Sequence, residues 1–339
     1  MKSAEQELNE QKIKSLVASS YDIQNLRISV GNRIVASFNA QLGIHQNTTS
    51  SENTEEAEKE TMKTLALISK EFDKITEAYV ANRQTIRAFF KKNDPGLTYI
   101  KTEADYKLVE IWKELTPTER HINKLLKTEV HKHPMWDAFF SGVVGCGEQM
   151  AAVIISNFDI AVARHPSCFW AYAGLDVVNG KGRNRSASMQ VEREYVNTEG
   201  KVTKTKGLSY NPFVKSKMLG VLAPSFLKKP GCHYEQVYRD YRARLEQRED
   251  LDGATARKHK MALRYCVKMF LRDMWVVWRK LERYQVKTPE YEVQFLGHEP
   301  HGYNAAFDSE VTQQEQGNQQ TLLNKRIVKY RMDKVNRKK

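Results

Sequence analysis

Apolar residues recur every three or four positions along most of the chain, which is the spacing of one face of an α-helix. Segments 1–44 and 61–133 both carry such a stripe, and the polar, acidic segment 45–60 between them is typical of a linker. We therefore expect long antiparallel helices that resemble a coiled coil, through which the chain forms a homo-oligomer. The first stripe consists of Ile13, Leu16, Val17, Ile23, Leu26, Val30, Ile34 and Phe38.

The run Thr116-Pro117-Thr118-Glu119 carries the signs of a helix start. Thr116 can serve as the N-cap, Pro117 fits the first helical position, and Glu119 completes a capping box. The sequence thus predicts that one helix, from about 103 to 115, ends here and that another runs to about 131.

Segment 134–284 mixes shorter helices with one β-hairpin. Gly145-Cys146-Gly147 lies between an apolar turn and a helix-forming stretch, which is the pattern of a helix-hairpin-helix. Val191, Tyr195 and Val196 precede the turn residues 197–200, and this order predicts the β-hairpin. The periodic stretch 254–284 predicts a last helix before the basic tail, 285–339. The predicted fold class is mainly α: a long-helix N-terminal region, then a helical domain containing the helix-hairpin-helix and a small β-hairpin insertion.

The chain of 339 residues has a formal net charge of +13, which favours a polyanionic partner, nucleic acid before a membrane surface. No apolar run is long enough to span a bilayer. The N-terminus lacks the apolar core of a secretory signal, and the four cysteines form no CxxC pair. We therefore expect a cytoplasmic, nucleoid-associated protein with no membrane partner.

The glycines of the hairpin predict a contact with a phosphate backbone. Gly145 and Gly147 let backbone amides approach a phosphate closely, and the helix N-terminus at Glu148 favours an anion. The alternative interpretation is a purely structural turn. Further basic residues either line the same polyanion or form solvated faces: Lys181, Arg183, Arg185, Lys204, Lys206, Arg264, Lys268 and Arg272.

Three runs in this region resemble the C-terminal domain of the Piv/MooV-type transposases, which belong to insertion-sequence classes one-ten, one-sixteen and nine-oh-two. They are 145–152, Asn157-Phe158-Asp159-Ile160 and Phe169-Trp170-Ala171-Tyr172-Ala173-Gly174-Leu175. The resemblance implies a DNA-binding protein of transposition or site-specific recombination, with a structured guide RNA as a further partner. The family also carries a RuvC-like domain with four metal-binding acids. The helical pattern of the first 133 residues does not match that domain, so Mg²⁺ is expected only if a partner supplies it.

The resemblance also implies a nucleophilic serine soon after Leu175. The nearest serines are Ser186 and Ser188, and Arg183 and Arg185 could stabilise the charge of a phosphorane. The alternative is a polar loop beside phosphate-binding arginines. No metal-ligand cluster, HExxH or P-loop motif is visible in the sequence, and no cofactor is expected from it.

Three hypotheses remain open at this point. The first is a transposase-type DNA-binding protein whose metal chemistry comes from another subunit or has been lost. The second is an active strand-transfer enzyme using Ser186 or Ser188. The third is a nonenzymatic nucleic-acid-binding regulator. Composition does not distinguish DNA from RNA.

Overall fold

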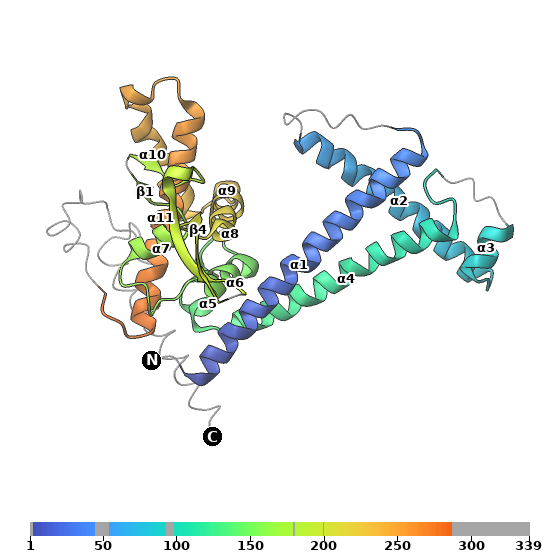
Figure 1. Cartoon of the computed structure of the whole chain (residues 1–339), viewed down its shortest axis with the longest axis horizontal. Helices are drawn as coiled ribbons and strands as arrows, with labels where there is room; N and C mark the ends of the chain where they lie inside the picture. Colours follow the sequence, from blue (N-terminus) through green and yellow to red (C-terminus); the bar gives the residue numbers. More distant parts are fainter. Residues whose placement is uncertain (1–2, 45–53, 93–97, 179, 199, 287–339) are drawn as a thin grey trace. The chain divides into compact units, whose positions relative to one another are not determined.

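The computed structural model describes residues 3–44, 54–92, 98–178, 180–198 and 200–286. The chain is mainly helical, as the sequence predicts, and its strands form two small two-stranded sheets (Figure 1). It divides into two compact units, one formed by residues 18–125 and the other by the segments before and after them. The basic tail lies outside the described residues from position 287 onward.

In the unit of residues 18–125, the described residues form four helices. They are α1 (Ala4–Gln41), α2 (Thr54–Ala81), α3 (Ile86–Lys92) and α4 (Glu103–Lys132), of which α1 and α4 also extend into the other unit. Residues 54–60, about the first two turns of α2, lie inside the segment predicted as a linker, so the prediction is wrong there. The hydrophobic core of this unit contains Ile34, Val35, Phe38, Leu65, Ile68, Phe72, Ile75, Phe89, Ile100, Tyr106 and Val109.

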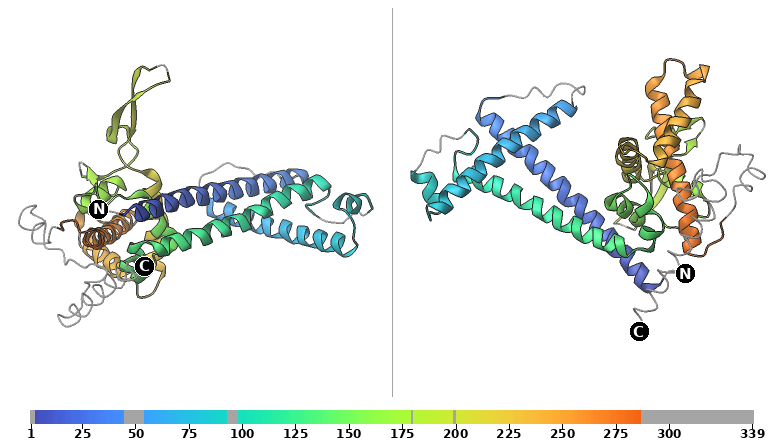
Figure 2. Two further views of the ribbon diagram at one scale, coloured as in Figure 1. Left: turned by 90° about the horizontal axis from the view of Figure 1, so that it is seen from below. Right: turned by 180° about the vertical axis from the view of Figure 1, so that it is seen from behind.

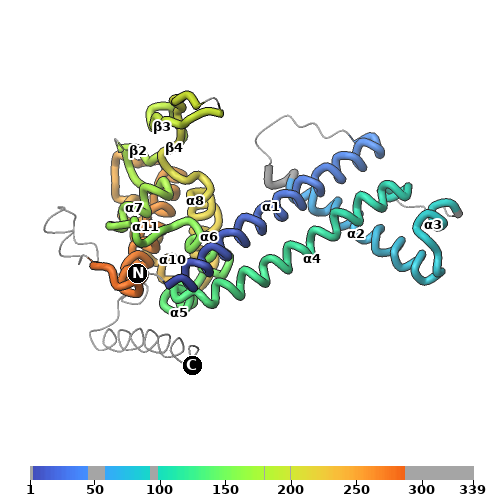
Figure 3. Tube along the Cα trace, turned by 60° about the horizontal axis from the view of Figure 1, so that its bottom comes forward, coloured from blue at the N-terminus to red at the C-terminus, as the bar shows by residue number. Residues whose placement is uncertain are grey.

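Helix α4 is continuous through Pro117, so the predicted break at Thr116 is wrong. Proline removes one backbone hydrogen bond from a helix interior. The carbonyl that loses its partner is that of Lys113, and the Thr118 hydroxyl donates to the next carbonyl, that of Glu114, at 2.9 Å. Helix α1 runs antiparallel beside α4 over this stretch (Figure 3), and Arg27 forms an ion pair with Glu119 at 2.6 Å. Packing against α1 thus overrides the local signal for a helix start.

The other unit is organised around α11 (Thr255–Leu281), the last helix predicted from the sequence. Its side chains Trp275 and Trp278 are almost wholly buried, and the Trp275 indole donates to the carbonyl of Ala163 at 2.8 Å. The remaining helices of this unit are α5 (Pro134–Ala138), α6 (Glu148–Asn157), α7 (Pro166–Tyr172), α8 (Pro212–Lys217), α9 (Ala223–Lys228) and α10 (His233–Glu246).

A β-ribbon extends from this unit, as the sequence predicts (Figure 2). Strand β3 (Gln190–Val196) pairs antiparallel with β4 (Val202–Leu208). A shorter pair, β1 (Val177–Val178) and β2 (Lys181–Gly182), precedes it. Most side chains of the ribbon are exposed, so it contributes little to the core.

Candidate nucleic-acid interface

The turn that ends α7 fixes the position of the segment leading into α8. Gly174 has a φ of +64°, and a Cβ at this residue would lie 2.6 Å from Tyr210 Cδ2. Glycine is therefore required both for the left-handed backbone and for the close approach of the Tyr210 ring. The amide of Asn211 donates to the carbonyl of Tyr172 at 2.8 Å. The sequence prediction that Gly174 ends this helix is confirmed, and Tyr210 is held against the turn.

Helix α8 begins directly after this anchor. The Asn211 side chain accepts hydrogen bonds from the amides of Phe213 and Val214, and Pro212 takes the first helical position. Both features are typical of a helix start. They direct Lys215, one turn further along α8, toward the loop that follows β2.

Five basic side chains gather here from three elements. The loop after β2 supplies Arg183 and Arg185, α8 supplies Lys215, and α11 supplies Arg264 and Lys268. We call these five residues the cation cluster. Electrostatic interactions link Lys215 with Arg264, Arg183 and Arg185, and link Lys268 with Arg264. Positions far apart in the sequence thus produce one concentrated positive charge.

Among the described residues, Asp176 is the carboxylate that forms an ion pair with this cluster. Both of its oxygens accept hydrogen bonds from Arg183. Arg183 Nε donates to Asp176 Oδ1 at 2.7 Å and Nη2 donates to Oδ2 at 2.6 Å. The guanidinium also bonds to the Ser209 hydroxyl. This ion pair neutralises Arg183, which holds the loop in place. The positive charges of the other four members of the cation cluster are not offset by a carboxylate of their own.

Three of those four cations have neutral partners. Lys215 donates to the carbonyl of Arg183, and Arg264 donates to the carbonyl of Asp176 at 3.2 Å. The ammonium of Lys268 lies 4.3 Å from the centre of the Trp170 ring, whose indole donates to the carbonyl of Lys268 at 3.0 Å. These contacts orient the side chains without cancelling their charge.

Three of these cations have lowered pKa values, and burial is the largest cause for each. Burial, followed by repulsion from Arg264, lowers the pKa of Lys215 to about 8. The same two causes, in the same order, lower the pKa of Lys268. Burial also lowers the pKa of Arg264. Like charges held together in partly buried positions cost folding free energy, and an anion bound between them would recover it.

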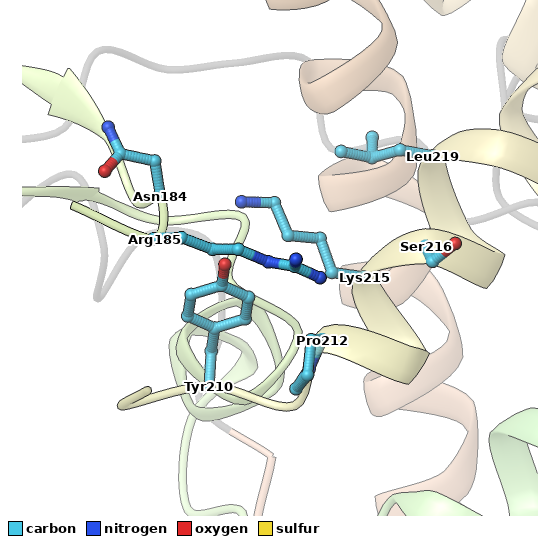
Figure 4. Close-up of a pocket in the computed structure, with 7 residues that line it drawn as sticks. All are labelled: Asn184, Arg185, Tyr210, Pro212, Lys215, Ser216 and Leu219. Atoms are coloured by element: carbon cyan, nitrogen blue, oxygen red, sulfur yellow. The ribbon is translucent and has the colours of Figure 1, made fainter. Parts of the chain in front are cut away.

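A pocket of about 330 Å³ opens between the loop after β2 and α8. Arg185, Lys215 and the Tyr210 hydroxyl approach one another in it (Figure 4). Leu219 lies on the opposite side, in a π-helical turn (Met218–Leu222) between α8 and α9. Pro224 has no N–H to bond the carbonyl of Gly220, and the preceding amide, that of Ala223, donates to the carbonyl of Met218 in the i→i−5 pattern of a π-helix. Such π-turns frequently occur at functional sites.

The predicted glycine hairpin lies at the N-terminal end of α6, away from the cation cluster. Asn157 is the last residue of α6, and its Oδ1 accepts a hydrogen bond from Asn211 Nδ2 at 3.4 Å. Gly147 directly precedes the first residue of the helix. Ten helical residues separate the two ends by about 15 Å. The hairpin and the cation cluster are therefore two places on one unit.

Gly145 and Gly147 differ in their surroundings. Gly145 has a φ of +93°, and a Cβ there would lie 3.0 Å from Phe226 Cδ1. The space around the Gly147 Cα is open. Glu148 forms ion pairs with Lys127 at 2.7 Å and with His131 at 3.4 Å. Gly145 thus serves packing, and Gly147 alone leaves room for a ligand.

The remaining predicted basic residues lie apart from the cluster. Arg272 is buried beside Asp273, with 5 % of its surface exposed. On the ribbon, Lys204 pairs with Glu194 at 3.4 Å, and Lys206 stands opposite Glu192. A further exposed residue, Lys181, belongs to β2. With Arg193 included, strands β3 and β4 carry three basic and two acidic residues, a net charge of +1, so the ribbon is not a strongly basic surface.

The hydroxyls of the predicted nucleophiles bond to each other: Ser186 Oγ lies 3.1 Å from Ser188 Oγ. Within the described residues, no histidine or carboxylate side chain bonds to either hydroxyl. The described residues also contain no group of three or more His, Cys, Asp or Glu side chains placed to hold a metal ion. In the described part of the first 133 residues, every regular element is a helix.

Sequence reasoning did not single out Asp176, Tyr210 or Lys215. Lys215 belongs to the basic segment after 177, but nothing in its spacing distinguishes it from its neighbours. The available signal was Asn211-Pro212, since a capping residue before proline places Lys215 on the first turns of a helix.

No protein-family model, curated protein or solved structure gives a significant match to this chain. None of the described helices has both the length and the apolar composition needed to cross a lipid bilayer.

Proposed function

We propose that this protein binds DNA through its phosphate backbone, as a transposase-type protein acting in transposition or site-specific recombination. The observation that carries the proposal is the cation cluster, in which four cations remain after Arg183 has neutralised Asp176. Phosphate contacts of this kind position a protein on nucleic acid without reading its sequence. The transposase assignment itself rests on the resemblance of residues 145–175 to the Piv/MooV-type family.

The second part of the proposal concerns the complex in which the protein works. We propose that it acts in the cytoplasm as a homo-oligomer joined through its N-terminal helices, with a structured RNA as a further partner. Any Mg²⁺-dependent step would use a RuvC-like domain of another subunit. A nonenzymatic regulator that binds nucleic acid through the same cluster is the alternative function.

The salt dependence of DNA binding tests the proposal. The logarithm of the affinity for a duplex of arbitrary sequence should fall steeply and linearly with the logarithm of salt concentration. Arg185→Ala and Lys268→Ala should each reduce this slope by about 0.9, the contribution of one phosphate contact. The matched control is Lys204→Ala, because Lys204 already pairs with Glu194. A slope that neither cluster variant changes would overturn the proposal.

Strand-transfer chemistry is a separate candidate, which the bonded pair Ser186 and Ser188 makes testable. If either serine attacks a phosphodiester, a nicked suicide substrate should accumulate as a covalent phosphoseryl adduct. The adduct should disappear in the double variant Ser186→Ala/Ser188→Ala. Binding without an adduct would favour the nonenzymatic role.

A further inference from the structure

The pocket between the loop after β2 and α8 is larger than a phosphate site requires. Its volume is about 330 Å³, and it is widely open to solvent. A phosphate group has only five heavy atoms. The space that remains could hold a sugar and a base.

The lining of the pocket has two chemically different parts. Arg185, Lys215 and the Tyr210 hydroxyl supply cations and a donor on one side. Pro212 and Leu219 supply apolar surface, and Asn184 and Ser216 add neutral polar groups (Figure 4). A nucleotide has this same division into an anionic phosphate, an apolar base face and polar base edges.

The Tyr210 ring is not available for stacking, because the residue is buried, with 7 % of its surface exposed. Gly174 packs against the ring, and the Lys215 ammonium lies 4.6 Å from its centre. Tyr210 therefore contributes its hydroxyl, and the base would lie against Pro212 and Leu219.

We propose that this pocket takes one unpaired nucleotide of a nucleic-acid strand, with its phosphate at Arg185 and Lys215 and its base beside Leu219. The proposal rests on the proposed function and names the structural element that the site recognises. A strand is favoured over a free nucleotide because the positive charge continues beyond the pocket. On α11, Arg264 interacts with Lys215 and Lys268 interacts with Arg264, so both residues are placed to meet neighbouring phosphates.

An unpaired nucleotide is required because a base inside a duplex is stacked and paired. Extruding it from the duplex costs free energy, and the cost is least where the base is already unpaired. The site would therefore direct the protein to bulges, overhangs or strand junctions.

Competition binding with the full chain tests this inference. The probes are a blunt duplex, the same duplex with a single-nucleotide bulge, and deoxyadenosine monophosphate alone. We expect the bulged duplex to bind at least tenfold more tightly than the blunt duplex, and the mononucleotide to bind far more weakly than either. Leu219→Asp should bring the affinities for the bulged and the blunt duplex to the same value, because it removes the apolar contact of the unpaired base, and its carboxylate near Arg185 and Lys215 should also lower both affinities.

Val221→Asp is the matched control, because Val221 lies in the same π-helical turn, is 47 % exposed and does not line the pocket. It should keep the preference. Ser216→Tyr, which fills the pocket from an exposed position on α8, provides a second variant if Leu219→Asp does not fold.

Equal affinity of the wild type for bulged and blunt duplexes would overturn this inference and leave duplex binding intact. Mononucleotide binding as tight as that of the bulged duplex would overturn the strand assignment. Absence of binding to every nucleic acid would overturn the proposed function as well.

Discussion

The guanidinium of Arg264 lies directly over the Cα of Gly182. A Cβ built on Gly182 would stand 2.6 Å from Arg264 Cζ, closer than carbon atoms approach without a shift. Gly182 ends the short strand β2, and Arg264 comes from α11. The missing side chain therefore provides the space in which this member of the cation cluster is held.

Gly182→Ala should weaken DNA binding by displacing Arg264. The guanidinium is the end of a flexible side chain and can move aside, so the fold should survive while the cluster loses one positioned charge. We expect the affinity for a duplex to fall about tenfold, the equivalent of one charge-assisted contact of about 1.4 kcal/mol. Fluorescence anisotropy at fixed salt would measure the change.

Gly207→Ala is the control for this substitution. A Cβ there would make an ordinary contact of 3.6 Å with the Arg193 side chain. Binding should stay within twofold of wild type. If Gly182→Ala and Gly207→Ala behave alike, the close packing of Arg264 on Gly182 has no role in binding.

Lys215→Met should make the protein more stable and a weaker DNA binder. The folded-state pKa of Lys215, about 8, lies below its ordinary value of 10.5, so its charge opposes folding at neutral pH. Lys215 is only partly buried, and solvent screening reduces the effect to about 1 kcal/mol at pH 7. Thermal or denaturant unfolding would measure the gain, and a binding assay would measure the loss.

The same residue should make both stability and binding depend on pH. A lysine with a depressed folded-state pKa adds stability as the pH rises from about 8 to 10.5, because the unfolded chain then holds more protons. Lys215→Met should remove this gain and make the stability curve flatter above pH 8. Wild-type DNA affinity should fall between pH 7 and 9, and the variant should show a smaller fall. Identical pH profiles would contradict a charged Lys215 at the interface.

The helices and the β-ribbon could be predicted from the sequence because their signals are local. The spacing of apolar residues gave the long helices, and the turn residues 197–200 gave the ribbon. Pro117 shows the limit of such signals. The local pattern Thr116 to Glu119 indicates a helix start, but the contacts of α1 with α4, including Arg27 with Glu119, keep the helix intact.

The candidate site could be predicted only in part, because charge balance depends on neighbours in space. Lys204 and Lys206 look as basic in the sequence as Lys215, yet the register of β3 and β4 places glutamates opposite them. Arg272 follows Arg264 and Lys268 at intervals of four but turns into the core beside Asp273. Lys215 was overlooked because its position depends on the anchor between Asn211 and α7.

The ribbon should therefore contribute little to backbone binding. Lys204→Ala/Lys206→Ala removes two lysines whose charge Glu194 and Glu192 already offset. We expect duplex affinity to change less than twofold and the salt slope to change by less than about 0.5, well below one phosphate contact. A decrease of the salt slope by about 1.8, the value for two phosphate contacts, would instead make the ribbon part of the interface, as the sequence predicted.

Two substitutions in the glycine hairpin should distinguish a role in packing, at Gly145, from a role in phosphate binding, at Gly147. Gly145→Ala puts a side chain on a residue with a φ of +93° and brings it to 3.0 Å from Phe226, so it should destabilise the fold by about 1–3 kcal/mol. Gly147→Val meets open space and should cost less than about 1 kcal/mol, the typical effect of losing a helix cap. If amides at the start of α6 bind a phosphate, the introduced valine side chain would hold that phosphate away and weaken binding to all sequences alike. Unchanged affinity of Gly147→Val, or a loss confined to one sequence, would leave the hairpin as a structural turn and the cation cluster as the interface.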